Sequence, residues 1–251
     1  MRKQFFSTLI LILCFCFSGH PQTGKLTEVE FNHSLKDIWQ NNPNKIAHRK
    51  AIQLCLSNPD SPSALLNLYF LRKRISKGKL TNALNTIGPT LSSNEYAKSL
   101  RYYIDHEQLK IGDHCSDFKA QTYSGQSFVL SEVIHQKDVL VIFGGLNCLG
   151  KEAVGYYVDL YSQLDKEKVE IISFLYAENK EQLAPESMKY FNPWPVVSDL
   201  KGDHSLTKIN YNAQGTPTFE YINSKGRILE MKEGPSPKSI KLLKKHIYKK
   251  S

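Results

Sequence analysis

The chain has 251 residues, enough for one or two modest domains, and its composition is that of an ordinary globular protein. The formal net charge is +9, and many of the lysines lie near the C-terminus. We interpret these lysines as a solvated helix face, because no DNA- or RNA-binding motif accompanies them. A patch that binds nucleic acid or an anionic membrane is the less favoured alternative. We therefore expect no nucleic-acid partner.

Residues 1–19 are typical of a secretory signal peptide. Arg2 and Lys3 form a charged start, which is followed by an apolar core too short to span a bilayer comfortably and then by small residues. No later stretch could span a membrane, so we expect an exported protein in the oxidising environment of the periplasm. Loss of the signal peptide would lower the net charge to +9 − 2 = +7. Lipid anchoring through Cys14 or Cys16 is less favoured, because a large residue precedes each.

Three cysteines remain after the signal peptide: Cys55, Cys115 and Cys148. An odd number leaves at least one thiol without an internal partner. The cysteines do not have the spacing of a metal site, and the eight histidines form no metal-binding motif, so we expect neither a metal nor a cofactor. Cys55 lies in an apolar run, which indicates a buried small hydrophobe rather than a redox partner.

Residues 20–110 are expected to be mostly helical, because apolar residues recur there at helical spacing. The clearest helix is predicted from Ala64 to Lys77, with a wide apolar face and an end at Gly78. Ser92 and Glu95 have the spacing of a capping box, which predicts the start of another helix. No catalytic constellation stands out in this region.

Beyond this region the pattern changes to alternating strands and helices. Gln121–Phe128 is expected to form a β-hairpin around a Ser-Gly turn. The central elements are a buried strand over Val139–Phe143, an amphipathic helix over Lys151–Leu164 and a second buried strand over Val169–Leu175. Their order predicts a right-handed β–α–β unit with two parallel strands. A strand, a hairpin and a closing helix follow Pro217.

Cys148 lies in the loop between the first of these strands and the helix. A thiol near a helix N-terminus meets the positive end of the helix dipole and unpaired N–H groups, which favour the nucleophilic thiolate. Lys151, one turn further on, could add favourable positive charge. Cys148 is therefore the candidate catalytic residue, and Lys151 a candidate electrostatic one.

Residues 139–152 resemble the active-site stretch of the exported TlpA/ResA-type thiol–disulfide oxidoreductases, which are related to the AhpC/TSA proteins. The pattern of that stretch is roughly V-L-V-x-F-W-A-x-W-C-x-x-C-x-x-E, and Cys148 matches its first, nucleophilic cysteine. Ile111–Phe118 resembles the I-G-x-x-A-P-D-F motif of this family, and Gly215–Thr218 resembles its G-x-P-T motif. The resemblance covers about Ile111 to Tyr248, over half of the chain.

The resemblance implies an α/β class with a thioredoxin-like fold, in which helices flank a central mixed sheet. This domain would span residues 111–251 and follow the mostly helical region 20–110. The resemblance also implies that Pro217 is a cis-proline beside the active-site cysteine, and that the backbone at Thr216 pairs with an extended peptide substrate. The partner would be a protein or a small thiol or disulfide.

The sequence departs from the family pattern at three positions near the cysteine. Lys151 stands in place of the second cysteine, which excludes an internal C-x-x-C cycle at this site. Ile142 occupies the position at which thioredoxins carry a buried acid, and its aliphatic side chain cannot transfer protons. Asn147 replaces the aromatic residue before the cysteine. The site is therefore degenerate in its chemistry.

Two hypotheses follow from this degenerate site. In the first, the protein is a monothiol enzyme or sensor in which Cys148 forms mixed disulfides, with Cys115 as a possible resolving cysteine if the two Cα atoms lie within about 7 Å. In the alternative, it is a redox-inactive binding or accessory module that uses the groove at Pro217. A peroxidase of the AhpC/TSA type is less favoured, because Val141 and Gly145 stand where those enzymes have Pro and Thr.

Overall fold

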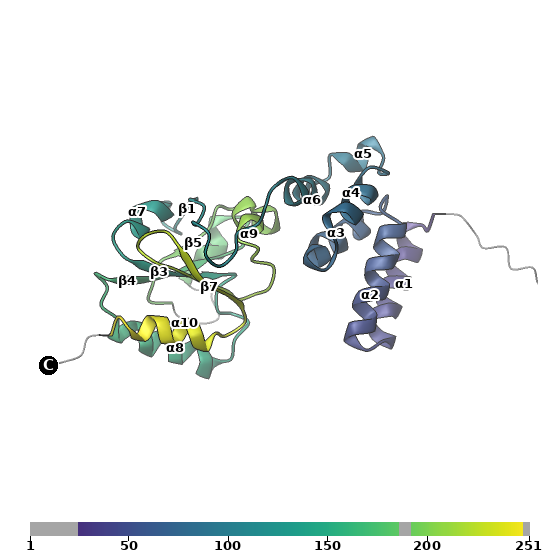
Figure 1. Cartoon of the computed structure of the whole chain (residues 1–251). Coiled ribbons are helices and arrows are strands. Elements are labelled where there is room, and N and C mark those ends of the chain that lie inside the picture. Colours follow the sequence, from purple (N-terminus) through teal and green to yellow (C-terminus); the bar gives the residue numbers. More distant parts are fainter. Residues whose placement is uncertain (1–24, 186–191, 248–251) are drawn as a thin grey trace, which may run out of the picture.

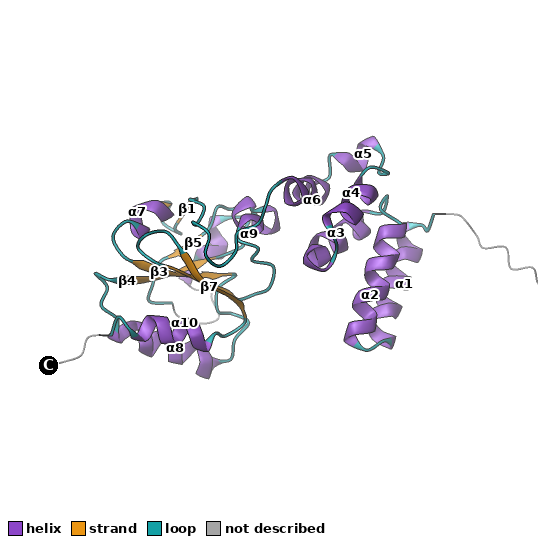
Figure 2. Ribbon diagram, in the orientation of Figure 1, coloured by secondary structure: helices purple, strands orange, loops and turns teal. Residues whose placement is uncertain are grey.

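The computed structural model describes residues 25–185 and 192–247, so the predicted signal peptide lies outside the described residues. The N-terminal part is helical, which confirms the prediction for this region (Figures 1 and 2). Among the described residues, no helix is both long enough and apolar enough to cross a membrane. The helical elements are α1 Glu28–Asn41, α2 Asn44–Ser57, α3 Pro62–Leu71, the 3₁₀ helix η1 Arg72–Arg74, α4 Lys77–Leu84, α5 Pro89–Ser92 and α6 Glu95–Asp105.

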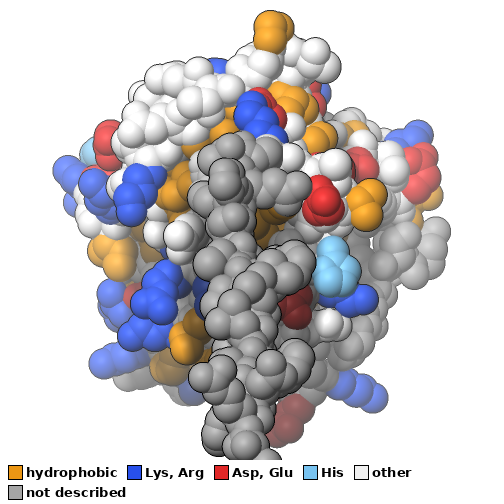
Figure 3. Space-filling view, turned by 90° about the vertical axis from the view of Figure 1, so that its right-hand side faces the viewer, with side chains coloured by type: hydrophobic (Ala, Val, Ile, Leu, Met, Phe, Trp, Pro, Cys, Tyr) orange, Lys and Arg blue, Asp and Glu red, His pale blue; other side chains and the backbone are white. Residues whose placement is uncertain are grey.

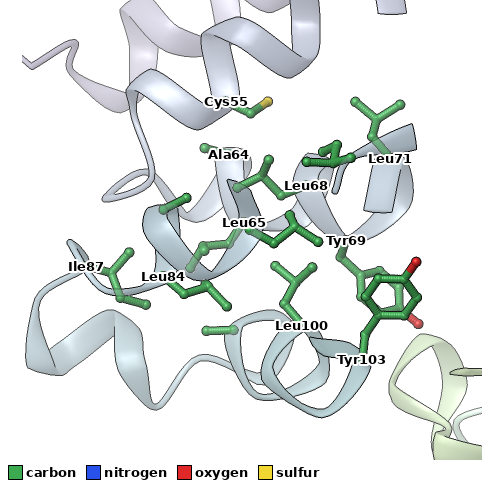
Figure 4. Close-up of a cluster of buried hydrophobic side chains, with 14 of the residues drawn as sticks. Cys55, Ala64, Leu65, Leu68, Tyr69, Leu71, Leu84, Ile87, Leu100 and Tyr103 are labelled. Atoms are coloured by element: carbon green, nitrogen blue, oxygen red, sulfur yellow. The ribbon is translucent and has the colours of Figure 1, made fainter. Parts of the chain in front are cut away.

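The helical region has a hydrophobic core of its own, formed by the apolar helix faces that the residue spacing predicts (Figure 4). Leu65 and Leu68 of α3 and Leu100 of α6 are fully buried in it, and so is Cys55 of α2. Burial raises the pKa of the Cys55 thiol to about 12. The interpretation of Cys55 as a buried small hydrophobe is therefore confirmed.

The helix predicted to extend to Lys77 is shorter than expected. It ends at Leu71, and Gly78 lies inside α4 rather than at a helix end. The reason is Ser76, whose side chain accepts a hydrogen bond from a backbone N–H of the first turn of α4 and caps that helix. A glycine two residues after a capping serine can sit in the first turn of a new helix as well as terminate an old one.

The predicted capping box at the start of α6 is also wrong. Asn94 caps this helix, since its side chain accepts a hydrogen bond of 2.9 Å from the backbone N–H of Tyr96. Ser92 instead belongs to the last turn of the short helix α5. The helix itself begins at Glu95, close to where the spacing predicted it.

The C-terminal part contains a mixed five-stranded sheet in the order β5-β4-β3-β6-β7. Strands β3 and β4 are parallel and are joined by α8, as the sequence pattern predicts, whereas β6 is antiparallel to β3 and β7 is antiparallel to β6. This β–α–β unit, followed by a β-hairpin and a helix, is the thioredoxin-like fold, which confirms the predicted fold class. The elements are β1 Lys119–Gln121, β2 Ser127–Val129, α7 Leu130–Ile134, β3 Asp138–Phe143, α8 Lys151–Gln163, β4 Val169–Phe174, η2 Lys180–Leu183, β5 Val196–Val197, η4 Gly202–His204, α9 Leu206–Asn210, β6 Thr218–Ile222, β7 Ile228–Glu233 and α10 Pro237–Lys244.

Alternate residues of the central strand β3 enter two different cores, because successive side chains of a strand point to opposite faces. Val141 and Phe143 pack against α7 and the segment after α9, whereas Leu140 and Ile142 pack against α8 and α10. Figure 1 shows α8 and α10 together on one face of the sheet, with α7 on the other. Because both faces are covered, every residue of β3 after Asp138 is buried.

The helical region and the sheet domain are joined through α9. Ile209 of α9 is fully buried within the hydrophobic core of the helical region. The backbone N–H of Leu109 donates a hydrogen bond of 2.9 Å to the carbonyl of Asn210. A helix that belongs to the sheet domain by sequence is therefore shared with the helical region by packing.

Basic side chains are spread over the surface that the structure describes. On the face shown in Figure 3, seen from the side of the helical region, they are interspersed with acidic, apolar and uncharged groups. On α10, Leu243 is buried while Lys238, Lys241 and Lys244 are exposed, so these three lysines form a solvated helix face.

Candidate functional site

Cys148 lies in the loop between the end of β3 and the start of α8. The loop begins after Phe143, and α8 begins at Lys151 with Gly150 at its N-cap position. Leu146 is buried in the core between the sheet and α8, and anchors the loop. Cys148 itself is exposed. The thiol therefore sits at the surface, two residues before the N-cap of α8.

Gly144 and Gly145 let this loop pass close to two other segments. Both have a positive φ, +79° and +66°, which a residue with a side chain rarely adopts. A Cβ atom on Gly144 would overlap the methyl group of Thr216, and one on Gly145 would lie 2.5 Å from Cδ2 of Leu175. Gly144 therefore allows the start of the Cys148 loop to lie directly against Thr216, the residue before Pro217, and Gly145 allows it to lie against Leu175.

The peptide bond between Thr216 and Pro217 is cis. Thr216 is exposed and Pro217 is buried, directly before β6 begins. The first residue of β6, Thr218, pairs with Phe143, the last residue of β3. This register places Thr216 and Pro217 at the end of the sheet where β3 delivers the Cys148 loop, as the resemblance implies.

The structure does not bring Cys115 to the same place. Its backbone N–H donates a hydrogen bond of 2.8 Å to the carbonyl of Gly226, in the turn between β6 and β7. That turn follows Ile222, which pairs with Val139 at the start of β3. From Val139 to Phe143, β3 rises four residue steps of about 3.3 Å, or about 13 Å. Cys115 and Cys148 therefore lie near opposite ends of the sheet.

All three cysteines of the described chain are free thiols. The position of Cys115 does not place it within disulfide distance of Cys148, which requires Cα atoms within about 7 Å. Burial raises the pKa of the half-buried Cys115 thiol above its usual value, although a hydrogen bond with Tyr211 opposes this effect. The expected resolving role of Cys115 thus has no support from this arrangement.

Lys151 is the first residue of α8 and is exposed. It is three residues from Cys148 and adds positive charge at the end of the helix where the dipole is also positive. Asn147, beside the cysteine, is exposed as well. Both residues are thus near Cys148 in the chain and, like it, exposed to solvent.

Glu220 is a buried acid that the sequence reasoning missed. It lies on β6 opposite Val141, and both of its carboxyl oxygens are buried without a hydrogen-bond partner among the described residues. Burial raises the pKa of Glu220 well above its usual range, and the nearby charge of Lys73 opposes this only in part. The glutamate in the otherwise apolar run Thr-Phe-Glu-Tyr-Ile was the available signal, because a strand buried on both faces leaves such a residue no exit to solvent.

Glu220 does not replace the acid that is missing at Ile142. Directly paired residues of antiparallel strands point to the same face, so Glu220 shares the face of Val141. Ile142 points to the opposite face, under α8. Among the described residues of β3 and β6, Glu220 is the only buried acid, and it lies on the face of the sheet away from α8.

No protein-family model matches the sequence, and no curated protein matches it. Among solved structures, the chain is similar to the thioredoxin domain of a thiol-disulfide oxidoreductase from Bacteroides vulgatus, with 20% identity over 56% of this chain and 100% of that chain and a TM-score of 0.46. It is similar to a thiol-disulfide oxidoreductase from Bacteroides fragilis, with 20% identity over 53% of this chain and 98% of that chain and a TM-score of 0.45. A thioredoxin-like protein from Bacteroides caccae matches over 87% of this chain and 83% of its own, with 13% identity and a TM-score of 0.43. The thioredoxin-like fold of this chain rests on its own strand order and crossover.

Proposed function

We propose that the protein carries out thiol–disulfide exchange through Cys148 acting as a single thiol. The observation that supports this most directly is the position of Cys148, exposed on a loop whose first residue, Gly144, packs against Thr216. The loop that carries the thiol therefore starts against the residue before Pro217. The names of the similar oxidoreductases from Bacteroides are consistent with this chemistry.

The reaction is a nucleophilic displacement at sulfur. The Cys148 thiolate attacks one sulfur of a disulfide RS–SR′, a new Cys148–SR bond forms, and the RS–SR′ bond breaks. R′S⁻ leaves with the bonding electron pair and takes up a proton from water. Cys148 is oxidised in this step and the R′ thiol is reduced, so no further oxidant or reductant is required.

The mixed disulfide would be resolved by a second molecule. Lys151 stands where a second cysteine would attack, and Cys115 lies near the opposite end of the sheet. A thiolate from a partner protein or a small thiol would therefore attack the Cys148–SR bond and release Cys148. The need for an external thiol to release Cys148 favours a monothiol cycle over an internal dithiol cycle.

The protein would work outside the cytoplasm. Residues 1–19 are typical of a signal peptide, so we propose export to the periplasm with cleavage of this segment. In that compartment disulfides form and persist, which supplies the substrates of the proposed reaction. We further propose the division of the exported chain into a helical region, 20–110, and a thioredoxin-like domain, 111–251.

The test begins with the exported protein, purified without reductant. Its free thiols are counted by mass spectrometry before and after reduction, and its exchange rate with a model disulfide is compared with that of a Cys148→Ser variant. An adduct on Cys148, together with loss of exchange in the variant, would support the proposal. Three free thiols that react slowly, or unchanged turnover in the variant, would contradict it and favour a redox-inactive binding module.

A further inference from the structure

The segment that leads to Pro217 is held from the side of the helical region. We define the proline segment as residues 209–217. Its first residue, Ile209, is fully buried in the core of the helical region. The hydroxyl of Tyr102 on α6 donates a hydrogen bond of 2.9 Å to the side-chain oxygen of Asn210. The Lys73 ammonium on η1 donates a hydrogen bond of 3.1 Å to the carbonyl of Asn212.

Lys73 reaches the same segment a second time through Glu233. Its ammonium lies 2.5 Å from a carboxyl oxygen of Glu233, the last residue of β7. The Glu233 carboxyl group lies against Gly215, where a Cβ atom would be only 3.0 Å from its carboxyl carbon. Burial alone would raise the pKa of Glu233, but Lys73 and the nearby backbone of Gly215 bring it below its usual value.

Lys73 therefore acts on the proline segment at two points, the carbonyl of Asn212 and, through Glu233, the backbone of Gly215. The chain turns at Asn212, which has a positive φ of +52°. The next residue after Gly215 is Thr216, whose side chain contacts the start of the Cys148 loop. A shift of this segment would move the backbone of Thr216 relative to the thiol.

We propose that Lys73 is a positioning residue for exchange with polypeptide disulfides, and that it acts by holding residues 212–216 against the loop that carries Cys148. The inference rests on the proposed function. A small disulfide needs only access to the exposed thiol, whereas an extended peptide must also align along the backbone at Thr216. Loss of Lys73 would therefore slow exchange with a peptide and leave exchange with a small disulfide unchanged.

The test compares two probes that release the same leaving group. One is 2,2′-dithiodipyridine, and the other is an extended peptide whose cysteine carries a 2-thiopyridyl disulfide. Second-order rate constants are measured with the full reduced chain, and the reaction of a Cys148→Ser variant is subtracted as a blank. The change under test is Lys73→Met. Lys73→Arg, which retains the positive charge and hydrogen-bond donors on a long side chain, serves as the conservative variant.

Lys77→Met is a closely matched control. The Lys77 ammonium also contacts one carbonyl, that of His106 at 2.8 Å, and one carboxylate, that of Glu107 at 3.4 Å. Both lysine side chains are 31% exposed. Lys77 has no contact with the proline segment among the described interactions. Its loss therefore removes a similar ion pair at a place that does not touch residues 209–217.

We expect Lys73→Met to slow the peptide probe about two- to five-fold, the range of a partly exposed ion pair. The small probe should be unchanged, Lys73→Arg should retain the wild-type rate, and Lys77→Met should affect neither probe. Glu233→Gln breaks the same pair from the other side, so it should slow the peptide probe as well. Adding Lys73→Met to Glu233→Gln should then cause less slowing than the two single effects combined, because the residues act through one contact.

Two results would overturn the inference while leaving the proposed function intact. In one, Lys73→Met slows both probes equally, which indicates a general structural effect. In the other, it slows neither probe although the wild-type chain reacts with both. A wild-type chain that reacts no faster than Cys148→Ser with either probe would instead overturn the proposed function and the inference with it. If Lys73→Met does not fold, Glu233→Gln supplies the same comparison.

Discussion

Glu220 allows a direct test of the described packing, independent of any activity. Its side chain is fully buried on β6, and both carboxyl oxygens lack a hydrogen-bond partner within residues 25–185 and 192–247. Because burial disfavours the charged form, the pKa of Glu220 in the folded protein lies well above its usual range, although Lys73 opposes the shift in part. In the unfolded chain the pKa of a glutamate is about 4.3. Glu220→Gln keeps the size of the side chain and removes its ability to ionise.

The sign of the effect follows from proton binding. Between about pH 4.3 and the pKa of Glu220 in the folded state, the folded protein holds a proton on Glu220 that the unfolded chain has lost. The free energy of unfolding therefore falls by about 1.4 kcal/mol for each pH unit in this interval. Below about pH 4.3 the group is protonated in both states, so its stabilising contribution is fully present. Above the folded pKa the loss is complete and the slope from this residue vanishes.

The assay is urea unfolding of the wild type and Glu220→Gln at several pH values between about 5 and 8. The difference in unfolding free energy, variant minus wild type, should grow in favour of the variant by about 1.4 kcal/mol per pH unit from about pH 5 upward, and should level off once the pH exceeds the pKa of Glu220 in the folded protein. Glu132→Gln, the same substitution on the exposed side of α7, controls for the loss of one negative charge. A difference for Glu220→Gln that stays constant across this range would refute the reasoning, because it would mean that Glu220 ionises as easily in the folded state as in the unfolded chain.

Three further predictions concern the backbone, a helix cap and a buried thiol. In urea unfolding, Gly144→Ala should destabilise the protein more than Gly125→Ala. Both positions have a positive φ, which costs an alanine about 1–2 kcal/mol, but only at Gly144 would the new Cβ atom meet another side chain, which adds about 1–3 kcal/mol. Equal losses of stability would contradict the close approach of the Cys148 loop to Thr216. Asn94→Ala should lower the free energy of unfolding by about 1 kcal/mol, and Ser92→Ala should lower it by less. A larger loss for Ser92→Ala than for Asn94→Ala would mean that Asn94 is not the N-cap of α6. Burial raises the pKa of the Cys55 thiol to about 12, so Cys55 should react with a thiol reagent only when the protein unfolds. Its labelling should therefore follow the urea unfolding transition, and rapid labelling of the native protein would show that the helical core opens.

Prediction from the sequence worked best where the signal is local. The β-branched run before Phe143 is buried on both faces, and the short Gly-rich loop after it turns the chain into an amphipathic helix, so the β–α–β unit follows from hydrophobic period and turn residues alone. Helix starts were less reliable. Ser92 and Asn94 are both good capping residues, and only the backbone geometry around them decides which side chain reaches a free N–H.

The sequence by itself determined the order of strands and helices, the place of Cys148 after the central strand, and the absence of a second cysteine three residues later. These are properties of neighbouring residues, and neighbours in the chain remain neighbours in the fold. Only the tertiary structure decided that Cys115 lies near the far end of the sheet, that the Glu220 carboxyl group is buried without a hydrogen bond to any described residue, and that Lys73 reaches the segment before Pro217. Each of these depends on which distant segments meet, and that is set by strand register and by the packing of α9 into the helical core.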